Sequence, residues 1–297
     1  MSHTTEKRLS FGLPWLDDAL GGGLRPGTLT VIAGATGAGK TQLGLRWANE
    51  GADQEGRRGV FFDLTSRGDP QHQEDYASRQ FNWSIEEATE LSARVGSILA
   101  ADLPLPELYR PFAHIGRRAT RPDVDPEAWH SWKTDMGRVL REGATFAYGQ
   151  LARGVRRLVF DGVEPAERAS DSIQLDYFEY LYEKVIRQDF DWAAREVLRE
   201  RYRAHEAEVL ARPYNSTSIG GLVLYTAPQV LLDDLIAEPI GKGDLFATAN
   251  TVIVMGRTRN AGSLGRALCV IKHRGSACDD RVLTYNIGAE GLIPLPA

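Results

Sequence analysis

Residues 34–41 of the chain read Gly34-Ala35-Thr36-Gly37-Ala38-Gly39-Lys40-Thr41. This stretch fits the pattern G-x-x-x-x-G-K-[ST], a glycine-rich loop that holds phosphate groups. Residues 28–33 before it are short, apolar and β-branched, which predicts a buried strand, and residues 42–49 after it predict a helix. The glycines let the backbone approach a phosphate closely, and the N–H groups of the turn and of the helix start point at the anion. The sequence therefore predicts a strand, a phosphate-binding loop and a helix in succession.

Two side chains of this loop are expected to act together with its backbone. Lys40 would reach the β- and γ-phosphates of ATP, and the Thr41 hydroxyl would ligate Mg²⁺. The predicted nucleotide-binding residues are Gly34, Ala35, Thr36, Gly37, Ala38, Gly39, Lys40 and Thr41. A glycine-rich turn that binds nothing is the alternative, and the match at every pattern position with suitable flanks on both sides disfavours it.

The composition is that of an ordinary globular protein. The chain has 297 residues, of which 42% are hydrophobic and 25% charged, and its formal net charge is −5. An acidic chain is a poor candidate for sequence-independent nucleic-acid binding, which needs a basic surface. Cys269 and Cys278 form no metal-ligand spacing, residues 1–10 contain no signal-peptide core, and no apolar run would span a membrane. We therefore expect a soluble cytoplasmic protein without a membrane partner, and the acidic charge disfavours a nucleic-acid partner.

A second strand with an acidic end lies far downstream of the loop. Residues 156–162 are apolar after two arginines and end in Asp161 and a glycine, which is the form of a Walker B segment. The aspartate of such a segment holds Mg²⁺ directly or through water, and magnesium needs few protein ligands. A strand that ends in aspartate is common, so this interpretation depends on the loop upstream. Thr41 and Asp161 are the predicted metal ligands.

The segment before the loop carries a more specific pattern. Gly12, Leu16 and Asp17 precede the run from Leu20 to Gly23, and a Pro-Gly pair leads into the loop strand. This arrangement resembles the KaiC-like branch of the RecA superfamily of P-loop ATPases, and the likeness extends over about residues 9–68, 155–163 and 219–293. The resemblance implies an α/β fold with a RecA-like core, in which helices flank a mostly parallel sheet. It also implies a single domain over residues 1–297 that forms a homo-oligomer, such as a hexamer.

The same resemblance assigns roles near the other end of the chain. Residues 272–276 read Lys-His-Arg-Gly-Ser, and in KaiC-like ATPases the Lys and Arg of this signature reach the γ-phosphate held by a neighbouring subunit. Lys272 and Arg274 are therefore expected to be catalytic together with Lys40, whereas His273 would face the other side of its strand and be structural. Thr226, at the end of a strand over residues 221–226, occupies the place of a polar side chain that can sense the γ-phosphate.

One position departs from the family pattern. Aligned by residues 61–64, the place of the glutamate that activates the attacking water holds Thr65. A hydroxyl is a poor base near neutral pH. Asp63, Asp69 and Glu74 are the alternative bases. We therefore expect ATP binding with slow Mg²⁺-dependent hydrolysis.

Two stretches have no counterpart in the resemblance. Residues 84–99 predict a helix with a capping box formed by Ser84 and Glu87, and residues 102–126 predict a loop. Residues 127–153 predict one long helix. Residues 166–215 predict an inserted helical hairpin, which is either a structural cover or a docking surface for a protein partner.

Three functions remain open at this point. The first is a KaiC-like ATP-driven ring or nucleotide switch with a regulatory role. The second is a DNA recombination ATPase of the RecA kind, which the acidic charge disfavours. The third is a degenerate nucleotide-binding scaffold with little hydrolysis, which Thr65 favours. A small-molecule kinase would leave Lys272 and Arg274 without a purpose.

Overall fold

The computed structural model of the chain describes residues 7–65, 72–89, 91, 98–99, 106–113, 126–165, 172–237, 244–260 and 263–296. Within these residues a nine-stranded sheet organises the fold, with the strand order β3-β2-β4-β5-β1-β6-β7-β8-β9. The strands are β1 (Leu29–Gly34), β2 (Val60–Asp63), β3 (Leu108–Tyr109), β4 (Arg157–Val163), β5 (Gly220–Thr226), β6 (Thr251–Asn260), β7 (Ser263–His273), β8 (Leu283–Gly288) and β9 (Gly291–Pro294).

The sheet has a parallel part and an antiparallel part. The strands from β3 to β6 in this order are parallel, and β6, β7, β8 and β9 pair antiparallel. Every residue of β1, β2 and β4 is buried, as expected for parallel strands that are covered on both faces. Because parallel strands all end at the same edge, the segments that follow β1, β2, β4 and β5 meet there. This carboxyl edge is where the predicted loop lies.

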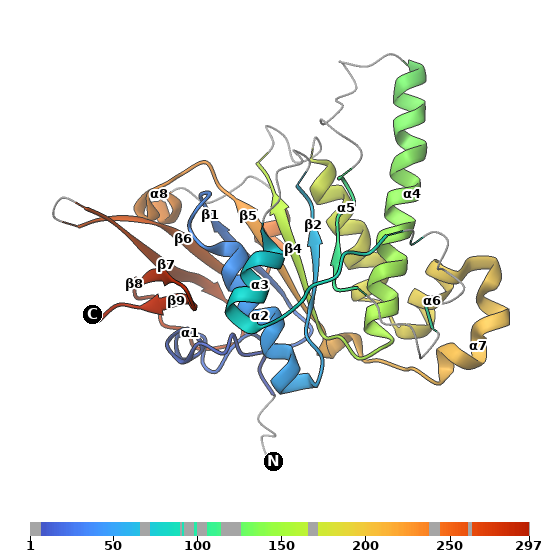
Figure 1. Ribbon diagram of the computed structural model, residues 1–297, viewed down its shortest axis with the longest axis horizontal. Coiled ribbons are helices and arrows are strands. Elements are labelled where there is room, and N and C mark those ends of the chain that lie inside the picture. The colour runs from blue at the N-terminus through green and yellow to red at the C-terminus, as the bar shows by residue number, and fades with distance from the viewer. Residues whose placement is uncertain are drawn as a thin grey trace.

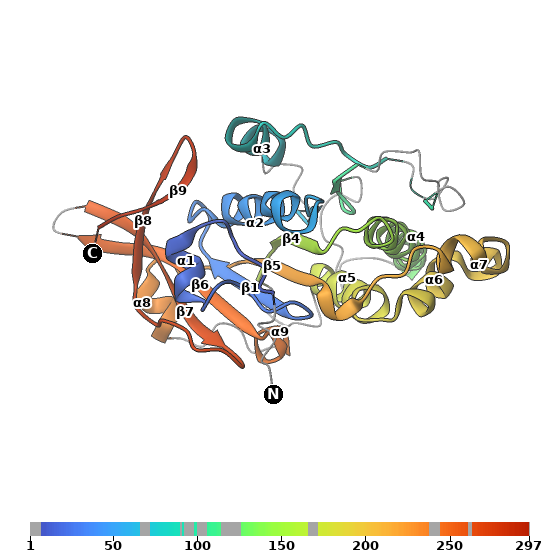
Figure 2. The same cartoon turned by 90° about the horizontal axis from the view of Figure 1, so that it is seen from below.

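Helices cover both faces of the parallel part. Two separate apolar clusters show this arrangement: Ile32 and Phe61 pack with α1 and α2, whereas Val31 and Phe62 pack with α4 and α5. Figure 2 shows α2 and α3 on one side of the strands and α5 on the other. The helices are α1 (Pro14–Ala19), α2 (Lys40–Glu55), α3 (Gln73–Phe81), α4 (Pro126–Leu151), α5 (Ile173–Leu181), α6 (Phe190–Leu198), α7 (Tyr202–Leu210), α8 (Leu232–Ala237) and α9 (Asp244–Thr248). The predicted α/β architecture is confirmed.

The two ends of the molecule are built differently. The antiparallel strands lie at one end, and α6 and α7 lie at the other (Figure 1). The predicted long helix is present as α4. The segment predicted as a helical hairpin contains α5, a π-helical turn (Tyr182–Ile186), α6 and α7. Its first part belongs to the core, because the Phe178 ring packs edge-on against Phe160 of β4 at 4.9 Å between centroids.

The predicted helix over residues 84–99 is wrong over residues 84–89. Residues 82–86 and 88–89 have no helical structure, Glu87 makes a parallel bridge to Leu108, and the Ala88 N–H donates to the Leu108 carbonyl at 2.7 Å. Leu108 belongs to β3, a strand inside a stretch predicted as loop, and β3 extends the sheet beyond β2. An unpaired sheet edge offers backbone hydrogen bonds, and this tertiary pairing overrides the helical spacing of the apolar residues. The Glu87 side chain pairs with Arg110 and caps no helix.

Within the described residues, the structure contains no helix that is both long and apolar enough to cross a membrane.

Candidate functional site

The glycine-rich loop joins β1 to α2 at the carboxyl edge. Gly39 precedes α2 with a left-handed φ of 103°, a conformation that side chains disfavour, and no side chain caps this helix start. The first N–H groups of an uncapped helix are available to an anion, and the helix dipole favours negative charge at this end. At the beginning of the loop, a Cβ on Gly34 would lie 2.1 Å from the Met255 carbonyl oxygen, so only glycine fits there.

A cleft of about 500 Å³ lies over the loop, and we call it the phosphate cleft. The predicted residues that line it come from four segments of the chain. They are Thr36, Gly37, Gly39, Lys40, Thr41, Thr65, Asp161 and Thr226. Gly34, Ala35 and Ala38 belong to the same loop but do not line the cleft. The structure thus brings together most of the residues that are predicted to act on the nucleotide of their own chain.

Lys40 lies buried beneath the loop with its ammonium group close to the cleft. Its Nζ donates a hydrogen bond to the Ala35 carbonyl oxygen at 3.1 Å. Burial lowers the pKa of Lys40, and the nearby Asp161 carboxylate opposes that shift. A desolvated cation with few partners gains strongly from a phosphate group, because charge-assisted hydrogen bonds are about twice as strong as neutral ones.

Thr41 and Asp161 meet although they are far apart in sequence. The Thr41 hydroxyl donates to Asp161 Oδ2 at 2.7 Å. The pKa of Asp161 is raised to about 6, chiefly by burial and in part by Asp63 on the adjacent strand, while the Thr41 hydrogen bond opposes the shift. A hydroxyl and a carboxylate beside an anion site are the hard oxygen ligands that Mg²⁺ prefers. These two side chains would hold the ion, which supplies charge neutralisation when it is bound.

The alternative bases proposed for the missing glutamate are engaged elsewhere. Thr65 lines the phosphate cleft, and its hydroxyl donates to Asp63 Oδ1 at 2.7 Å. Asp63 is only 1% exposed and also pairs with Arg110 at 3.3 Å. Glu74 pairs with the same guanidinium at 2.7 Å. Asp69 lies outside the described residues. Neither described alternative lines the cleft.

The antiparallel strands contact the loop through residues that the sequence did not indicate, and of these Arg266 lines the cleft. Arg266 of β7 donates through Nε to the Gly37 carbonyl oxygen at 3.3 Å, and Tyr285 of β8 donates to the Ala38 carbonyl oxygen at 2.6 Å. The further residues that line the cleft without having been predicted are Gln42, His72, Tyr76, Gly162, Glu164 and Ile287. No spacing in the sequence relates residues 266–287 to the loop, because strand pairing alone brings them together.

Lys272 and Arg274 lie at the opposite edge of the sheet. Lys272 lies near the end of β7 and Arg274 directly follows that strand. Because β7 runs antiparallel to β6, His273 pairs with Thr251 at the start of β6. Lys272 Nζ donates to the Phe246 and Ala247 carbonyl oxygens at 2.8 and 3.0 Å. Arg274 also donates to Ala247, at 3.0 Å. These two cations therefore do not reach the cleft of their own chain.

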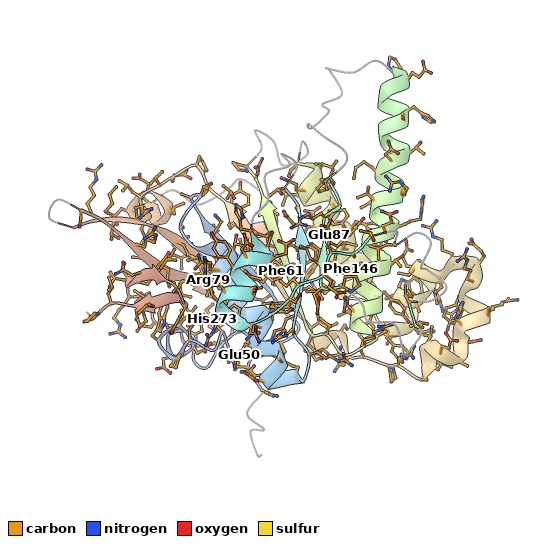
Figure 3. The ribbon with its side chains drawn as sticks, viewed as in Figure 1. Glu50, Phe61, Arg79, Glu87, Phe146 and His273 are labelled. Carbon is orange, nitrogen blue, oxygen red and sulfur yellow. The ribbon has the colours of Figure 1, made fainter. Side chains whose placement is uncertain are left out.

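His273 is structural, as predicted. Its ring is buried between the Thr251 hydroxyl at 2.8 Å and the Leu20 carbonyl oxygen at 3.1 Å. Figure 3 shows His273 towards the lower end of the sheet, at the level of Glu50 in the second half of α2. The parallel strands end at the top of the same view.

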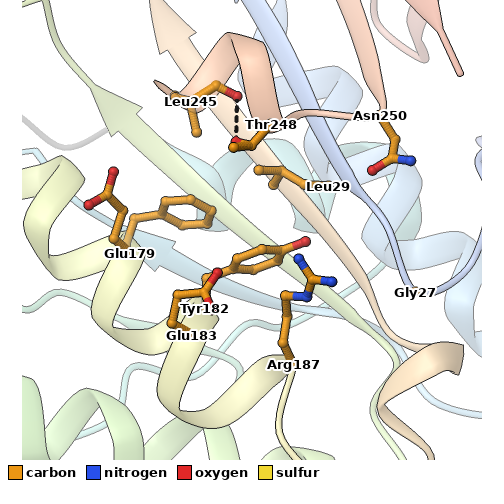
Figure 4. A pocket seen from close by; sticks show the side chains of 10 residues that line it. Gly27, Leu29, Glu179, Tyr182, Glu183, Arg187, Leu245, Thr248 and Asn250 are labelled. Atoms are coloured by element: carbon orange, nitrogen blue, oxygen red, sulfur yellow. Dashed lines mark hydrogen bonds between the residues drawn. The ribbon is translucent and has the colours of Figure 1, made fainter. Parts of the chain in front are cut away.

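A second hollow, of about 270 Å³, lies on this opposite edge (Figure 4). Tyr182 and Arg187 line one side of it, with the guanidinium carbon 5.7 Å from the ring centroid. Thr248 and Asn250 line the other side. The Asn250 carbonyl oxygen accepts a hydrogen bond from the Arg274 backbone N–H at 2.8 Å, so the hollow and the two cations are neighbours.

Comparison with known proteins agrees with this geometry. The family model of the KaiC ATPases matches residues 9–95. A similar solved structure is that of a KaiC-like protein from the hyperthermophilic archaeon Pyrococcus horikoshii OT3, with 18% sequence identity and a TM-score of 0.55. That match covers 97% of this chain and 99% of the other, and at this identity it shows the fold. No curated protein matches the sequence. The chain is thus similar to the KaiC-like branch of the RecA superfamily of P-loop ATPases, in sequence over its N-terminal part and in fold over nearly its whole length.

Proposed function

We propose that this protein binds Mg-ATP in the phosphate cleft, hydrolyses it slowly and assembles with copies of itself in response to the nucleotide. The observation that carries the proposal is the hydrogen bond between Thr41 and Asp161 at 2.7 Å, which joins the loop to the Walker B strand. A glycine-rich turn that binds nothing would have no need to bury an aspartate at this place, since desolvation of a carboxylate is unfavourable.

The residues of the cleft divide the work of binding. The backbone N–H groups of residues 37–41 and the Lys40 ammonium would hold the phosphates. Thr41 and Asp161 would hold Mg²⁺, and Thr226, which lines the same cleft, would sense the γ-phosphate. Catalysis would consist mainly of positioning and of charge stabilisation, as in other phosphoryl transfer reactions.

The opposite edge supports assembly into a homo-oligomer. Lys272 and Arg274 lie away from their own cleft, so they can act on a γ-phosphate only in another copy of the chain. A head-to-tail contact of this kind gives a closed ring, such as a hexamer, or an open filament. A cation supplied across the interface would stabilise charge on the phosphoryl oxygens.

The proposal also includes a regulatory role that is exerted through a protein partner. We treat residues 166–215 as an insertion within a single domain over residues 1–297. Trp192 on α6 is 61% exposed and Leu210 on α7 is 57% exposed. These side chains suit a docking surface for a protein partner, and a structural cover remains the alternative for the segment.

Two other functions have less support. A degenerate nucleotide-binding scaffold is favoured by one observation, the hydroxyl of Thr65 at the place of the expected glutamate. A DNA recombination ATPase would need a basic surface, and the formal net charge of −5 is unfavourable.

Native mass spectrometry of the wild type and of Lys40→Ala, each with and without Mg-ATP, tests the proposal. The wild type should carry one nucleotide per chain and shift to larger assemblies, and Lys40→Ala should do neither. A wild type that binds no nucleotide at millimolar Mg-ATP would reject the function. Binding without assembly would reject the role of the opposite edge and favour the scaffold.

A further inference from the structure

The phosphate cleft contains a carboxylate that no motif assigns. Glu164 follows β4, three residues after Asp161, and lines the cleft. In a regular strand successive side chains alternate between the two faces, so residues three apart would lie on opposite faces. Glu164 nevertheless lines the same cleft as Asp161, and this needs a local cause.

A bulge in β4 supplies that cause. Asp161 pairs with Leu224 of β5, and Val163 pairs with Tyr225, so β4 advances by two residues where β5 advances by one. The extra residue, Gly162, shifts the alternation by one position and returns Glu164 to the face of Asp161. The bulge therefore adds a second carboxylate to the same cleft.

The bulge is packed against the residue that replaces the expected glutamate. Gly162 has a φ of 87°, which favours glycine. A Cβ at this position would lie 2.6 Å from Thr65 Cγ2 and 3.0 Å from the Thr65 nitrogen. The end of β2 and the bulge of β4 are thus in direct contact, and Glu164 lines the same cleft as Thr65, which stands at the place of the family glutamate.

A buried amide holds the two strand ends together. Gln174 on α5, which is 6% exposed, accepts a hydrogen bond from the Glu164 backbone N–H at 3.0 Å. Its Nε2 donates to the Leu64 carbonyl oxygen at 2.8 Å. The backbone of Glu164 is therefore held in place relative to the end of β2.

The other carboxylates are less suited to act as a base. Of the described residues that line the cleft, only Asp161 and Glu164 carry a carboxylate. Asp161 accepts the Thr41 hydroxyl and is the proposed metal ligand. Asp63 and Glu74 do not line the cleft.

We propose that Glu164 is the catalytic base for hydrolysis, in place of the glutamate that is absent at Thr65. This inference rests on the proposed binding of ATP. Glu164 accepts a proton from water while the water oxygen forms a bond to the γ-phosphorus. The bond from that phosphorus to the β–γ bridging oxygen breaks, its electron pair stays on the β-phosphate of ADP, and inorganic phosphate leaves. Glu164 then releases the proton to solvent.

The test compares Glu164→Gln with Glu74→Gln, a matched loss of one carboxylate outside the cleft. Phosphate release measures turnover, calorimetry measures ATP affinity, and thermal unfolding checks the fold of each variant. Glu164→Gln should lower turnover by about 10²-fold, within the range typical of a general base, with ATP affinity unchanged. Glu74→Gln should leave turnover within about twofold of the wild type.

The outcomes separate this inference from the proposed function. A Glu164→Gln variant that turns over like the wild type would overturn the assignment, and so would a larger loss in Glu74→Gln. A wild type that binds Mg-ATP but releases no phosphate would overturn it as well and would leave the binding site intact. Failure of the wild type to bind ATP would reject the function itself.

Discussion

The two edges of the parallel sheet hold positive side chains in different ways. At the carboxyl edge, Lys40 is buried, makes one hydrogen bond to its own loop and lies near the Asp161 carboxylate. At the opposite edge, Lys272 and Arg274 donate to carbonyl oxygens at the end of α9. The first edge contains both the anion-binding groups and the acidic ligands of a complete site. At the second edge, Lys272 and Arg274 lie away from these groups, so they would need a second copy of the chain to become part of such a site.

The largest effect is expected from Lys40→Ala, which removes the cation of the complete site. ATP affinity should fall by at least about 100-fold, because a hydrogen bond to a charged group contributes about 1.5–3 kcal/mol and the lysine would span two phosphates. Isothermal titration calorimetry measures the affinity. The folded state should persist. The variant leaves Asp161 as a buried charge, but Asp161 still accepts the hydrogen bond from the Thr41 hydroxyl. Unchanged affinity would show that the nucleotide site is elsewhere.

Arg274→Ala tests the second edge and should have a smaller effect on binding. The variant should bind ATP in its own cleft nearly as the wild type does, while the larger assembly seen with ATP than with ADP is lost. Ligand that bridges two subunits stabilises the assembly by mass action, and ADP lacks the group that Arg274 would contact. Sedimentation velocity in ATP and in ADP measures the difference.

Matched variants sharpen this test of the opposite edge. Lys272→Ala should behave like Arg274→Ala. An exposed cation of the α6–α7 region provides the control, and Arg203→Ala should assemble like the wild type. A wild type that stays monomeric in ATP, or an Arg274→Ala variant that assembles normally, would contradict the comparison between the two edges.

Thr65→Glu tests whether a base at the family position is the one group that the carboxyl edge lacks for faster hydrolysis. It should raise turnover by about tenfold, less than the 10²–10⁴-fold typical of a general base, because Glu164 already supplies part of that role. Thr65→Gln introduces a side chain of similar length without the charge and should not raise turnover. Steady-state phosphate release measures both variants. Equal rates for the two variants would mean that the end of β2 does not face the reacting phosphate.

The sequence predicted the features that depend on local spacing. The loop with its flanking strand and helix, and the strands that lead to Asp161 and Thr226, follow from short patterns, and each element lies where its pattern indicated. Arg157 shows the limit of such patterns. It is buried, and its guanidinium binds Glu55 and the carbonyl oxygens of Ser10 and Trp47, yet in the sequence it is one arginine at a strand start.

The cleft residues that were missed depend on contacts between distant strands. Glu164 enters the cleft because β4 has a bulge relative to β5, and a bulge is a property of a pair of strands. Arg266 and Tyr285 reach the loop through antiparallel pairing at the other end of the chain. The helix prediction near Glu87 was wrong for the same reason, because the backbone of Glu87 pairs with Leu108 of the adjacent strand. Each case needs a partner strand that periodicity along one segment does not identify.

The smallest effect concerns the stability of the carboxyl edge without ligand. Burial raises the pKa of Asp161 from 3.8 to about 6, so its ionised form destabilises the folded state. The penalty is absent below the unfolded pKa, grows as the pH rises from about 4 to 6 and is constant above that. Its full size is on the order of 3 kcal/mol, from about 1.4 kcal/mol for each pKa unit, and this figure already includes the opposing effect of the hydrogen bond from Thr41. In chelator and without nucleotide, Asp161→Asn should therefore unfold a few degrees above the wild type at pH 8 and near it at pH 4.

Asp279→Asn provides the control with the opposite sign. Hydrogen bonds from Arg281 lower the pKa of Asp279, which is half-buried. At pH values above about 4 this carboxylate therefore stabilises the fold slightly, and its replacement should lower the unfolding temperature slightly. With saturating Mg-ATP the order for Asp161→Asn should reverse, because ligand binding stabilises only the protein that retains its metal ligand. Thermal unfolding of the three proteins across pH 4–8, with and without Mg-ATP, measures these differences. If Asp161→Asn were less stable than the wild type at pH 8 without ligand, Asp161 would be a structural residue, and the carboxyl edge would have no stability cost to set against ligand binding.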